Sequence, residues 1–370
     1  GHDIHKLTRI LNEAKRVDHA VLVHVMTKKG KGYVPAEENP SRFHGTGPFD
    51  IPSGTAVGKK ATDSYTDVFS KVLADIGKQD EKVVAITAAM ADGTGLARFA
   101  KMFPQRFFDV GIAEEHAMTF AAGLAAGGMK PVFAVYSSFL QRAFDQTIHD
   151  VCLQNLPVVF AIDRAGLVGS DGETHQGIFD ISYLSAIPNM TIMAPKNKWE
   201  LSDMIKYAVD FPTPIAVRYP RGEAYDGLKE YRQPISVGKS EWIYRESEIA
   251  LVALGSMVKT AEKVHAALRE EGIPASLINS RFAKPLDTQM LMEAASKHTL
   301  VVTMEENVIN GGFGEHITRF YNEQGIYVNV LNIAIPDEYV EHGNVDILYH
   351  EVGIDADTIL KRIKEVYHPL

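Results

Sequence analysis

The chain is poor in cysteine. Its 370 residues include a single one, Cys152, so no disulfide can form within the chain. Such cysteine usage is typical of a reducing compartment, and we expect a cytoplasmic protein. Cys152 lies in an apolar helical pattern, which favours a buried structural thiol over a nucleophile.

Long apolar runs and an excess of positive charge are also missing. No apolar run approaches the roughly 20 residues that span a membrane, and the first residues lack the pattern of a signal peptide. The net charge of −9 argues against nucleic acid and anionic membranes as partners. Because the sequence shows no metal-ligand spacing, we predict no metal ligands in this chain, and we find no internal repeat of solenoid period.

The chain does contain short apolar runs that alternate with helical patterns. The expected strands are Val83–Thr87, Phe107–Val110, Pro131–Tyr136, Val158–Asp163, Thr191–Ala194 and Ile215–Tyr219. The expected helices run from Tyr65 to about Gly77, over Phe139–Gln154 and over Lys198–Val209. This alternation predicts an α/β fold with a parallel sheet covered on both faces.

A second, smaller α/β sheet is expected after the polar stretch 226–247. Its strands and helices are predicted at Ile249–Gly255, Lys259–Glu271, Ala275–Asn279, Thr299–Glu305, Glu315–Gln324, Val328–Ile335 and Ala356–Tyr367. Within it, Gly311-Gly-Phe-Gly looks like a phosphate loop. A packing loop at a helix start is at least as well supported, since no Lys-Ser/Thr follows.

Residues 1–55 predict one helix, Ile4–Arg16, and one strand, Ala20–Met26, which cannot bury a core by themselves. We therefore expect sheet partners that are not in the sequence. The basic turn Thr27–Tyr33 suits either phosphate binding or a solvated turn. An extended linker is expected around Pro35, Pro40 and Pro48.

Polar and aromatic side chains follow three of the expected parallel strands. Ligands of such sheets bind beyond the carboxyl ends of the strands, so we expect these residues to meet at one edge: Tyr136, Phe139, Arg142, Asp171, His175 and Arg221. Each has an ordinary alternative, such as a surface charge or a turn. Together, two arginines, aromatics and an Asp/His pair predict a site for a sugar phosphate. Glu114 begins a helix of small residues, where the helix dipole alone also favours an acid.

These motifs in their order resemble the 1-deoxy-D-xylulose-5-phosphate synthase family of transketolase-like, thiamine-diphosphate-dependent transferases. The matching stretches are residues 24–33, Phe43-His44, 110–116, 136–146, 163–177 and Arg218-Tyr-Pro-Arg-Gly, so the resemblance covers essentially the whole chain. It implies a tail of the diphosphate-binding domain over 1–55, a parallel-sheet pyrimidine-binding domain over 56–235 and a smaller α/β carboxy-terminal transketolase-type domain over 236–370.

The resemblance also implies an activity and roles for residues. Pyruvate would be decarboxylated and its two-carbon unit transferred to D-glyceraldehyde 3-phosphate, as the first step of non-mevalonate isoprenoid synthesis. Glu114 would relay a proton to the aminopyrimidine of thiamine diphosphate, and Phe139 would stack on that ring. The implied residues are, for catalysis, Glu114, His44 and His175; for the cofactor, Tyr33, Glu114 and Phe139; for the substrates, Tyr136, Arg142, Asp171, His175 and Arg221.

One departure from the family is large. The Gly-Asp-Gly motif and later Asn that hold the diphosphate and its Mg²⁺ are absent from the sequence. We expect these ligands on an amino-terminal fragment that stays bound as a second chain, in a homodimeric enzyme, in preference to a true deletion that leaves no cofactor site. The alternatives are a 2-oxo-acid dehydrogenase β-type subunit, which residues 1–55 argue against, and a non-catalytic transketolase-like partner chain, which Glu114 argues against.

Overall fold

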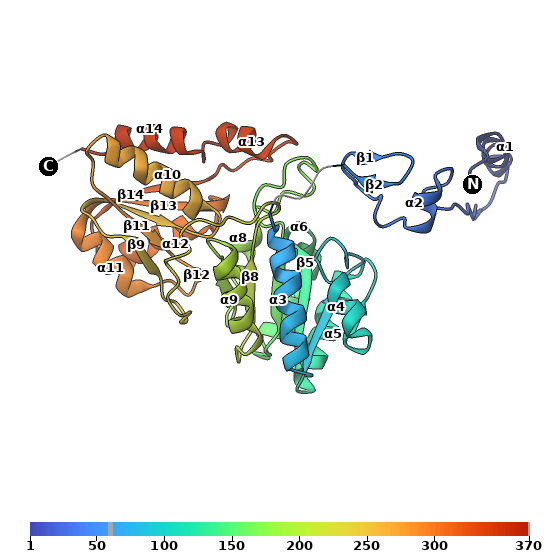
Figure 1. Ribbon diagram of the computed structural model, residues 1–370, viewed down its shortest axis with the longest axis horizontal. Helices are drawn as coiled ribbons and strands as arrows, with labels where there is room; N and C mark the ends of the chain where they lie inside the picture. Colours follow the sequence, from blue (N-terminus) through green and yellow to red (C-terminus); the bar gives the residue numbers. More distant parts are fainter. Residues whose placement is uncertain (58–61, 369–370) are drawn as a thin grey trace. The chain divides into compact units, whose positions relative to one another are not determined.

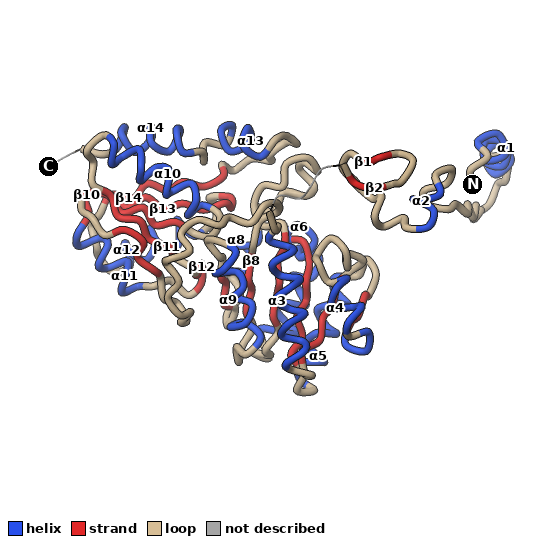
Figure 2. The backbone as a smooth tube through the Cα atoms, viewed as in Figure 1, coloured by secondary structure: helices blue, strands red, loops and turns tan. Residues whose placement is uncertain are grey.

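The computed structural model describes residues 1–57 and 62–368. The chain divides into two compact units, Gly1–Ala61 and Thr62–Leu370, and each is described by itself. The larger unit contains two mixed sheets with helices on their faces (Figures 1 and 2). Within the described ranges, no helix combines the length and apolarity that crossing a bilayer requires.

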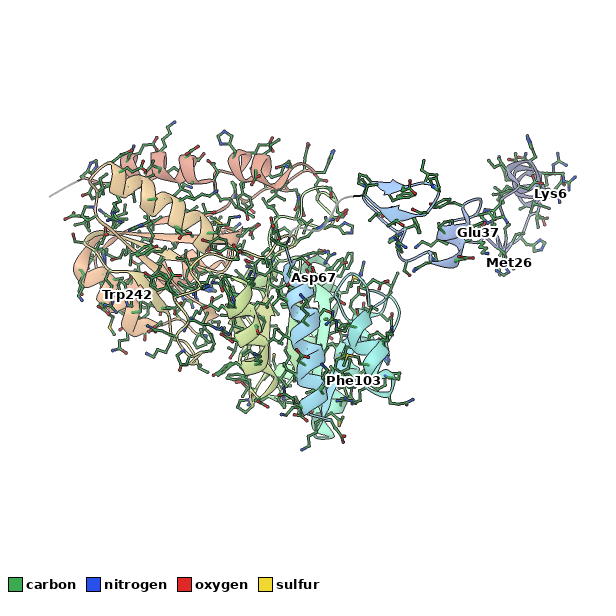
Figure 3. The ribbon with its side chains drawn as sticks, viewed as in Figure 1. Lys6, Met26, Glu37, Asp67, Phe103 and Trp242 are labelled. Carbon is green, nitrogen blue, oxygen red and sulfur yellow. The ribbon has the colours of Figure 1, made fainter. Side chains whose placement is uncertain are left out.

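The smaller unit confirms the expected helix but not the expected strand. It contains α1 (Ile4–Ala14), α2 (Val34–Glu38) and the antiparallel pair β1 (Phe49–Asp50) and β2 (Thr55–Ala56). The prediction of a strand at Ala20–Met26 is wrong: these residues form neither helix nor strand, and the Met26 side chain is exposed (Figure 3). Within residues 1–57 no described strand pairs with them, and a strand without a neighbour has no ladder. Pro35 opens α2 rather than extending the linker, since proline suits a first helical turn.

The first sheet of the larger unit has the order β12-β7-β8-β6-β5-β3-β4. Its strands are β3 (Val83–Thr87), β4 (Phe107–Asp109), β5 (Lys130–Tyr136), β6 (Val159–Asp163), β7 (Thr191–Met193), β8 (Ile215–Arg218) and β12 (Phe282–Lys284). All neighbours are parallel except β12, which pairs antiparallel with β7. The predicted parallel sheet is therefore confirmed, with an antiparallel edge that was not predicted.

Helices cover both faces of this sheet, as the apolar runs predict. On one face, Val132 and Ala134 of β5 pack with α3 (Tyr65–Gln79), α4 (Ala97–Met102) and α9 (Lys198–Val209). On the other face, Phe133 and Val135 pack with α5 (Glu114–Ala126). Successive strand residues point to opposite faces, so a continuous apolar run fills both cores.

The helix expected over Phe139–Gln154 is broken into short pieces. They are α6 (Ser137–Leu140), η2 (Gln141–Ala143), α7 (Phe144–Gln146) and the π-helical turn η3 (Thr147–Cys152). Cys152 is buried at its end, which confirms the prediction of a buried thiol. Two further short helices, η1 (Pro104–Arg106) and α8 (Asp180–Ser185), lie elsewhere along the first sheet.

The second sheet has the order β14-β13-β10-β11-β9 and is parallel except for β9. Its strands are β9 (Glu241–Tyr244), β10 (Glu248–Ala253), β11 (Ala275–Asn279), β13 (His298–Val308) and β14 (Asn329–Ile335). The helices are α10 (Met257–Glu270), α11 (Thr288–Lys297), α12 (Phe313–Glu323), α13 (Val345–Glu351) and α14 (Ala356–Val366). Strand β9 lies inside the stretch that the sequence indicates as a polar connection.

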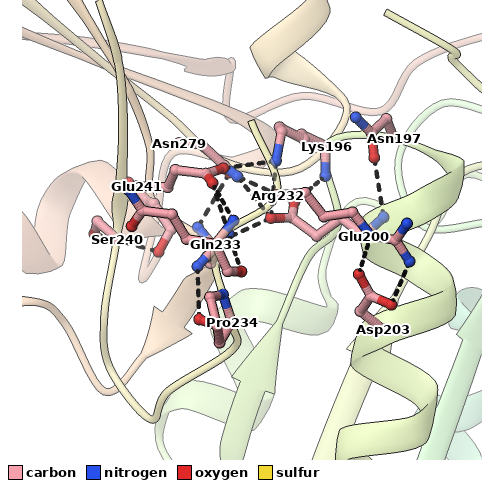
Figure 4. A network of polar contacts seen from close by, with 12 residues as sticks. Lys196, Asn197, Glu200, Asp203, Arg232, Gln233, Pro234, Ser240, Glu241 and Asn279 are labelled. Carbon is pink, nitrogen blue, oxygen red and sulfur yellow. Dashed lines mark hydrogen bonds and ion pairs between the residues drawn. The ribbon is translucent and has the colours of Figure 1, made fainter. Parts of the chain in front are cut away.

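The two sheets share one core and one buried polar network. Phe133 and Ala250, from different sheets, belong to the same cluster of buried apolar residues. Beside it, Lys196 contacts the carboxylates of Glu200 at 3.1 Å and of Glu241 at 2.7 Å (Figure 4). The Arg281 guanidinium contacts the same two carboxylates at 2.8 and 3.0 Å. All four side chains are buried. Alternating charges thus join the sheets within one unit: Glu241 comes from β9, Glu200 from α9, Lys196 from the loop before α9 and Arg281 from the turn after β11.

Candidate active site

Glu114 is the most buried of the sequence-predicted site residues. It is the first residue of α5, as predicted, and 1% of it is exposed. Its Oε1 accepts a hydrogen bond of 2.7 Å from Nη1 of Arg142. Its Oε2 is buried and has no hydrogen-bond partner among the described residues. A helix N-terminus favours a carboxylate, but a buried oxygen without a donor costs free energy unless a ligand supplies one.

Three side chains from the last residue of β5 onward extend the site from Glu114. The rings of Tyr136 and Phe139 stack with centroids 5.5 Å apart, and Phe139 meets the His175 ring edge-on at 5.3 Å. The Arg142 guanidinium lies 5.1 Å from the centre of the Phe139 ring. The structure therefore brings Glu114, Arg142, Phe139, Tyr136 and His175 into one continuous run of contacts.

Asp171 and Arg221 form a second part of the site: Asp171 lies on the loop that carries His175, and Arg221 follows β8. Nη1 of Arg221 contacts Oδ2 of Asp171 at 2.9 Å and donates to the backbone carbonyl of Val168 at 3.3 Å. Both charged side chains remain about half exposed, at 40% for Arg221 and 46% for Asp171. Arg221 is thus held by the loop while part of its guanidinium stays open to solvent.

Arg164 joins the site without having been singled out in the sequence. It follows β6 directly and has φ of 60°, and its guanidinium lies 3.8 Å from the Tyr136 ring centre. It also donates to the Gly93 carbonyl at 2.9 Å and pairs with Asp163 at 3.1 Å. Two features of the sequence could have pointed to Arg164: it directly follows a buried strand, and it lies within a stretch that matches the family motif.

Two groups at this strand edge, buried Asp163 and half-buried Tyr136, have shifted pKa values. Burial raises the pKa of Asp163 to about 6, although the Arg164 charge and a hydrogen bond from Thr66 oppose the shift. Burial likewise raises the pKa of Tyr136, against the charges of Arg164 and Arg221. The Tyr136 hydroxyl is therefore protonated at neutral pH and can donate a hydrogen bond.

Tyr33 and His44 lie in the smaller unit. The Tyr33 hydroxyl donates to the Ile51 carbonyl at 2.6 Å, and its ring contacts those of Phe43 and Phe49 at 5.5 and 5.8 Å. His44 is exposed. The assignment of Tyr33 and His44 to the same site as Glu114 stays a prediction.

Both glycine loops that the sequence suggests as phosphate sites hold carboxyl groups of the chain itself. In the basic turn, Glu37 accepts from the Gly32 N–H at 2.8 Å and pairs with Lys28 at 2.8 Å, and these two contacts hold its pKa at about 2. At the start of α12, Glu305 accepts from the N–H groups of Phe313 and Gly314, both at 2.8 Å. The second loop is therefore a helix-start packing loop, the alternative that the sequence left open.

The residues fit part of the cofactor that the motifs imply. The unpartnered Oε2 of Glu114 suits a hydrogen bond from an aminopyrimidine, and Phe139 lies next to the Glu114–Arg142 pair as a stacking surface. The described residues do not fit a magnesium ion, because they contain no cluster of three or more His, Cys, Asp or Glu side chains that could hold a metal ion. No step that uses magnesium follows from this chain.

Comparisons with known proteins agree with the fold and motifs. Residues 62–226 match the family described as the transketolase pyrimidine-binding domain, and residues 238–359 match the transketolase C-terminal domain. Curated relatives named 1-deoxy-D-xylulose-5-phosphate synthase occur in Lachnoclostridium phytofermentans and Caldanaerobacter subterraneus subsp. tengcongensis. They are 56% and 52% identical over 98% and 99% of this chain. The chain spans 58% and 59% of the length of these two relatives.

Solved structures show the same architecture. A split-gene transketolase, described as an inactive β4 tetramer, aligns with a TM-score of 0.73 and 27% identity, covering 83% of this chain and 99% of that one. A transketolase from Campylobacter jejuni aligns with a TM-score of 0.68 over 89% of this chain and 50% of its own. At 16% identity, the second likeness concerns the fold alone.

Proposed function

Because the chain belongs to the transketolase family, we propose that it is the pyrimidine-binding and carboxy-terminal part of a 1-deoxy-D-xylulose-5-phosphate synthase. The domain limits proposed are 1–55, 56–235 and 236–370. The whole enzyme would decarboxylate pyruvate and transfer the two-carbon unit to D-glyceraldehyde 3-phosphate, with thiamine diphosphate as cofactor. Synthases that are about half identical over nearly the whole chain support this choice of reaction.

The observation that carries the proposal is the Glu114 carboxylate. Its Oε1 is held by Arg142 and its Oε2 is buried without a donor in the described residues. A carboxylate fixed in this way can hold or release a proton at Oε2 without changing its position, which is what a proton relay requires. Thiamine diphosphate, when bound, supplies the carbanion and the electron sink that pyruvate decarboxylation needs.

The remaining residues would bind, orient and exclude water. Phe139 would stack on the cofactor's pyrimidine, and Tyr33 would contact the cofactor from the smaller unit. Half-exposed Arg142 and Arg221 would hold the acceptor's phosphate, where a guanidinium binds an oxyanion through two parallel donors.

The other polar groups would act on the reacting oxygens. Tyr136, protonated at neutral pH, would donate to a substrate oxygen, and Asp171 would accept from a hydroxyl. His44 and His175 would move protons on and off these oxygens, because an imidazole can take either role near neutral pH.

The proposal extends to assembly. The longer relatives contain a part that this chain does not span, and the corresponding part of this enzyme would hold the diphosphate and Mg²⁺. That part would be a covalent extension of this chain or a second chain, and the complete enzyme would be a homodimer. The split-gene transketolase supports this: the β-chain tetramer of that protein is described as inactive. We therefore expect the 370-residue chain alone to lack turnover.

The experiment joins the chain to the missing part of a synthase and measures CO₂ released from pyruvate in the presence of D-glyceraldehyde 3-phosphate. We expect Glu114→Gln to lower kcat by about 10² to 10⁴. The matched control is Glu115→Gln, an exposed carboxylate one residue further along α5, which should keep full activity. Full activity of the Glu114→Gln enzyme would contradict the proposed role, and transfer to a lipoyl acceptor instead would favour the dehydrogenase alternative.

A further inference from the structure

The loop that carries Asp171 and His175 is closed at its base. Gly166 and Gly177 form a β-bridge in which their backbone N–H groups and carbonyls exchange bonds of 2.6 and 2.8 Å. Gly166 has φ of 91°, a conformation that glycine adopts without strain. Residues 167–176, here called the site loop, therefore form a closed loop after β6. A contact that holds the base of this loop also holds Asp171 and His175 in place.

A carboxylate from the second sheet holds this base. Glu306 of β13 is 1% exposed, and its Oε1 accepts a 2.7 Å hydrogen bond from the Leu167 N–H. Its Oε2 accepts from the Ser256 hydroxyl at 2.5 Å, and the Tyr349 hydroxyl bonds to the same carboxylate. The fit is close, because a Cβ added at Gly166 would lie 2.2 Å from Cδ of Glu306.

A second contact from the same side fixes the end of the site loop. Gln176 is 2% exposed, and its side-chain oxygen accepts from the Val168 N–H at 2.7 Å. Its amide nitrogen donates to the Glu341 carbonyl at 3.0 Å. The Gly343 N–H donates to the Gly169 carbonyl at 3.3 Å. The site loop is thus bonded to two segments of the second sheet's half, one through Glu306 and one through residues 341–343.

We propose that Glu306 is a positioning residue for the proposed reaction: its carboxylate holds the Leu167 N–H and thereby places Asp171 and His175 for the aldehyde acceptor. This inference rests on the proposed function, and it gives the carboxy-terminal domain a role in substrate placement. Glu306 contacts the site loop and none of the predicted site residues, so it acts through the loop.

The competing explanation is that Glu306 only joins the two sheets. Glu241 provides the matched control, because it too is a buried carboxylate that accepts a backbone N–H, from Gln233 at 2.9 Å, and pairs with groups from the first sheet. Its contacts do not include residues 167–176. Loss of either carboxylate should lower stability, but only loss of Glu306 should free the site loop.

The first readout does not require activity. Amide hydrogen exchange of peptides covering residues 164–177 is compared among the wild type, Glu306→Ala, Glu306→Gln and Glu241→Ala, each in the assembled enzyme. We expect exchange in these peptides to accelerate in Glu306→Ala and to stay at the wild-type rate in Glu241→Ala. Glu306→Gln should restore slow exchange, because its amide oxygen can accept from Leu167 while its NH₂ donates to Ser256 and Tyr349.

The second readout is the acceptor dependence of turnover. We expect kcat/KM for D-glyceraldehyde 3-phosphate to fall roughly tenfold or more in Glu306→Ala, through KM, and to recover in Glu306→Gln. Unchanged exchange in Glu306→Ala, or equal acceleration in Glu241→Ala, would overturn the inference. If Glu306→Ala does not fold, Ser256→Ala and Tyr349→Phe each remove one donor to the carboxylate, and unchanged exchange in both would overturn it equally. If the assembled wild-type enzyme shows no turnover, the proposed function is refuted, and the exchange comparison still decides the role of Glu306.

Discussion

Nη1 of Arg142 lies 2.7 Å from Oε1 of Glu114, so the arginine assigned to substrate phosphate is the partner of the carboxylate assigned to the cofactor. Glu114 is buried, while Arg142 is 48% exposed. One guanidinium nitrogen is therefore bonded to Glu114, while about half of the Arg142 side chain stays accessible. A phosphate that binds Arg142 would lie within one side chain of the proposed proton relay.

This pair predicts a measurable coupling. Arg142→Leu leaves both oxygens of Glu114 without a donor in the described part of the chain, and we expect it to lower the free energy of unfolding by about 1–3 kcal/mol. In the double variant, which also carries Glu114→Gln, most of this loss should disappear, because position 114 then holds no charge. Urea unfolding of the wild type, both single variants and the double variant completes the cycle. Additive losses would mean that the two side chains do not interact in solution.

The polar network between the sheets predicts a pH-dependent loss. Burial alone would raise the pKa of Glu241, but hydrogen bonds from Lys196 and the Gln233 N–H hold it below the ordinary value of 4.5. The stability that this shift contributes is present above pH 4.5 and is lost as the pH falls through the folded-state pKa.

Lys196→Met should therefore cost about 3–5 kcal/mol at pH 7, because it leaves Glu200 and Glu241 charged with one cation fewer. The deficit relative to the wild type should shrink below pH 4.5, where protonation of Glu241 removes the charge that Lys196 pairs with. Denaturant unfolding at pH 7, 5 and 4 checks this. A deficit that is constant with pH would assign the effect to packing alone.

Glu305 predicts the opposite trend. Burial raises its pKa to about 8, even though the N–H groups of Gly314 and Phe313 favour the charged form. Between pH 4.5 and 8 the folded state holds a proton that the unfolded state has released, so stability should fall as the pH rises through this window, by at most about 1.4 kcal/mol per unit. Glu305→Gln should flatten the pH profile of the free energy of unfolding between pH 6 and 8. Glu315→Gln, at an exposed position in the first turn of α12, should change it much less, because the Glu315 charge is the smallest of the causes that act on the Glu305 pKa.

The cysteine offers a simple chemical probe. Burial raises the pKa of Cys152 to about 12, and 1% of the residue is exposed. We expect no reaction with iodoacetamide at pH 8 in the folded protein and complete alkylation in 6 M guanidinium chloride, because the thiolate is the reacting form. Mass spectrometry counts the added group. Rapid labelling of the folded protein would show that the turn η3 opens.

The parallel sheet and the meeting of the site residues could be predicted because both follow from local patterns. Continuous apolar runs such as Val83–Thr87 mark strands buried on both faces, and parallel strands end at the same edge. For that reason Tyr136, Phe139 and His175 were placed together from the sequence, and the structure confirms their contacts.

What could not be predicted depends on contacts between distant segments. Strand β12 is three residues long, and only its place beside β7 makes it a strand. The Glu306 carboxylate meets a backbone N–H 139 residues away, a pairing that no local pattern encodes. The prediction of a strand at Ala20–Met26 was wrong for a related reason. The apolar pattern of this segment is that of a strand, but a strand also needs a neighbouring strand to pair with.

Strand β12 has a consequence for synthesis on the ribosome. The strands β3 to β8 emerge first, but the edge of β7 stays open until β9, β10 and β11 have been made and residues 282–284 return to cover it. A nascent chain that stalls in this interval presents unpaired N–H and C=O groups, which neighbouring chains can add to. Residues 282–284 therefore protect the β7 edge, and we expect a chain that ends before them to aggregate through this edge.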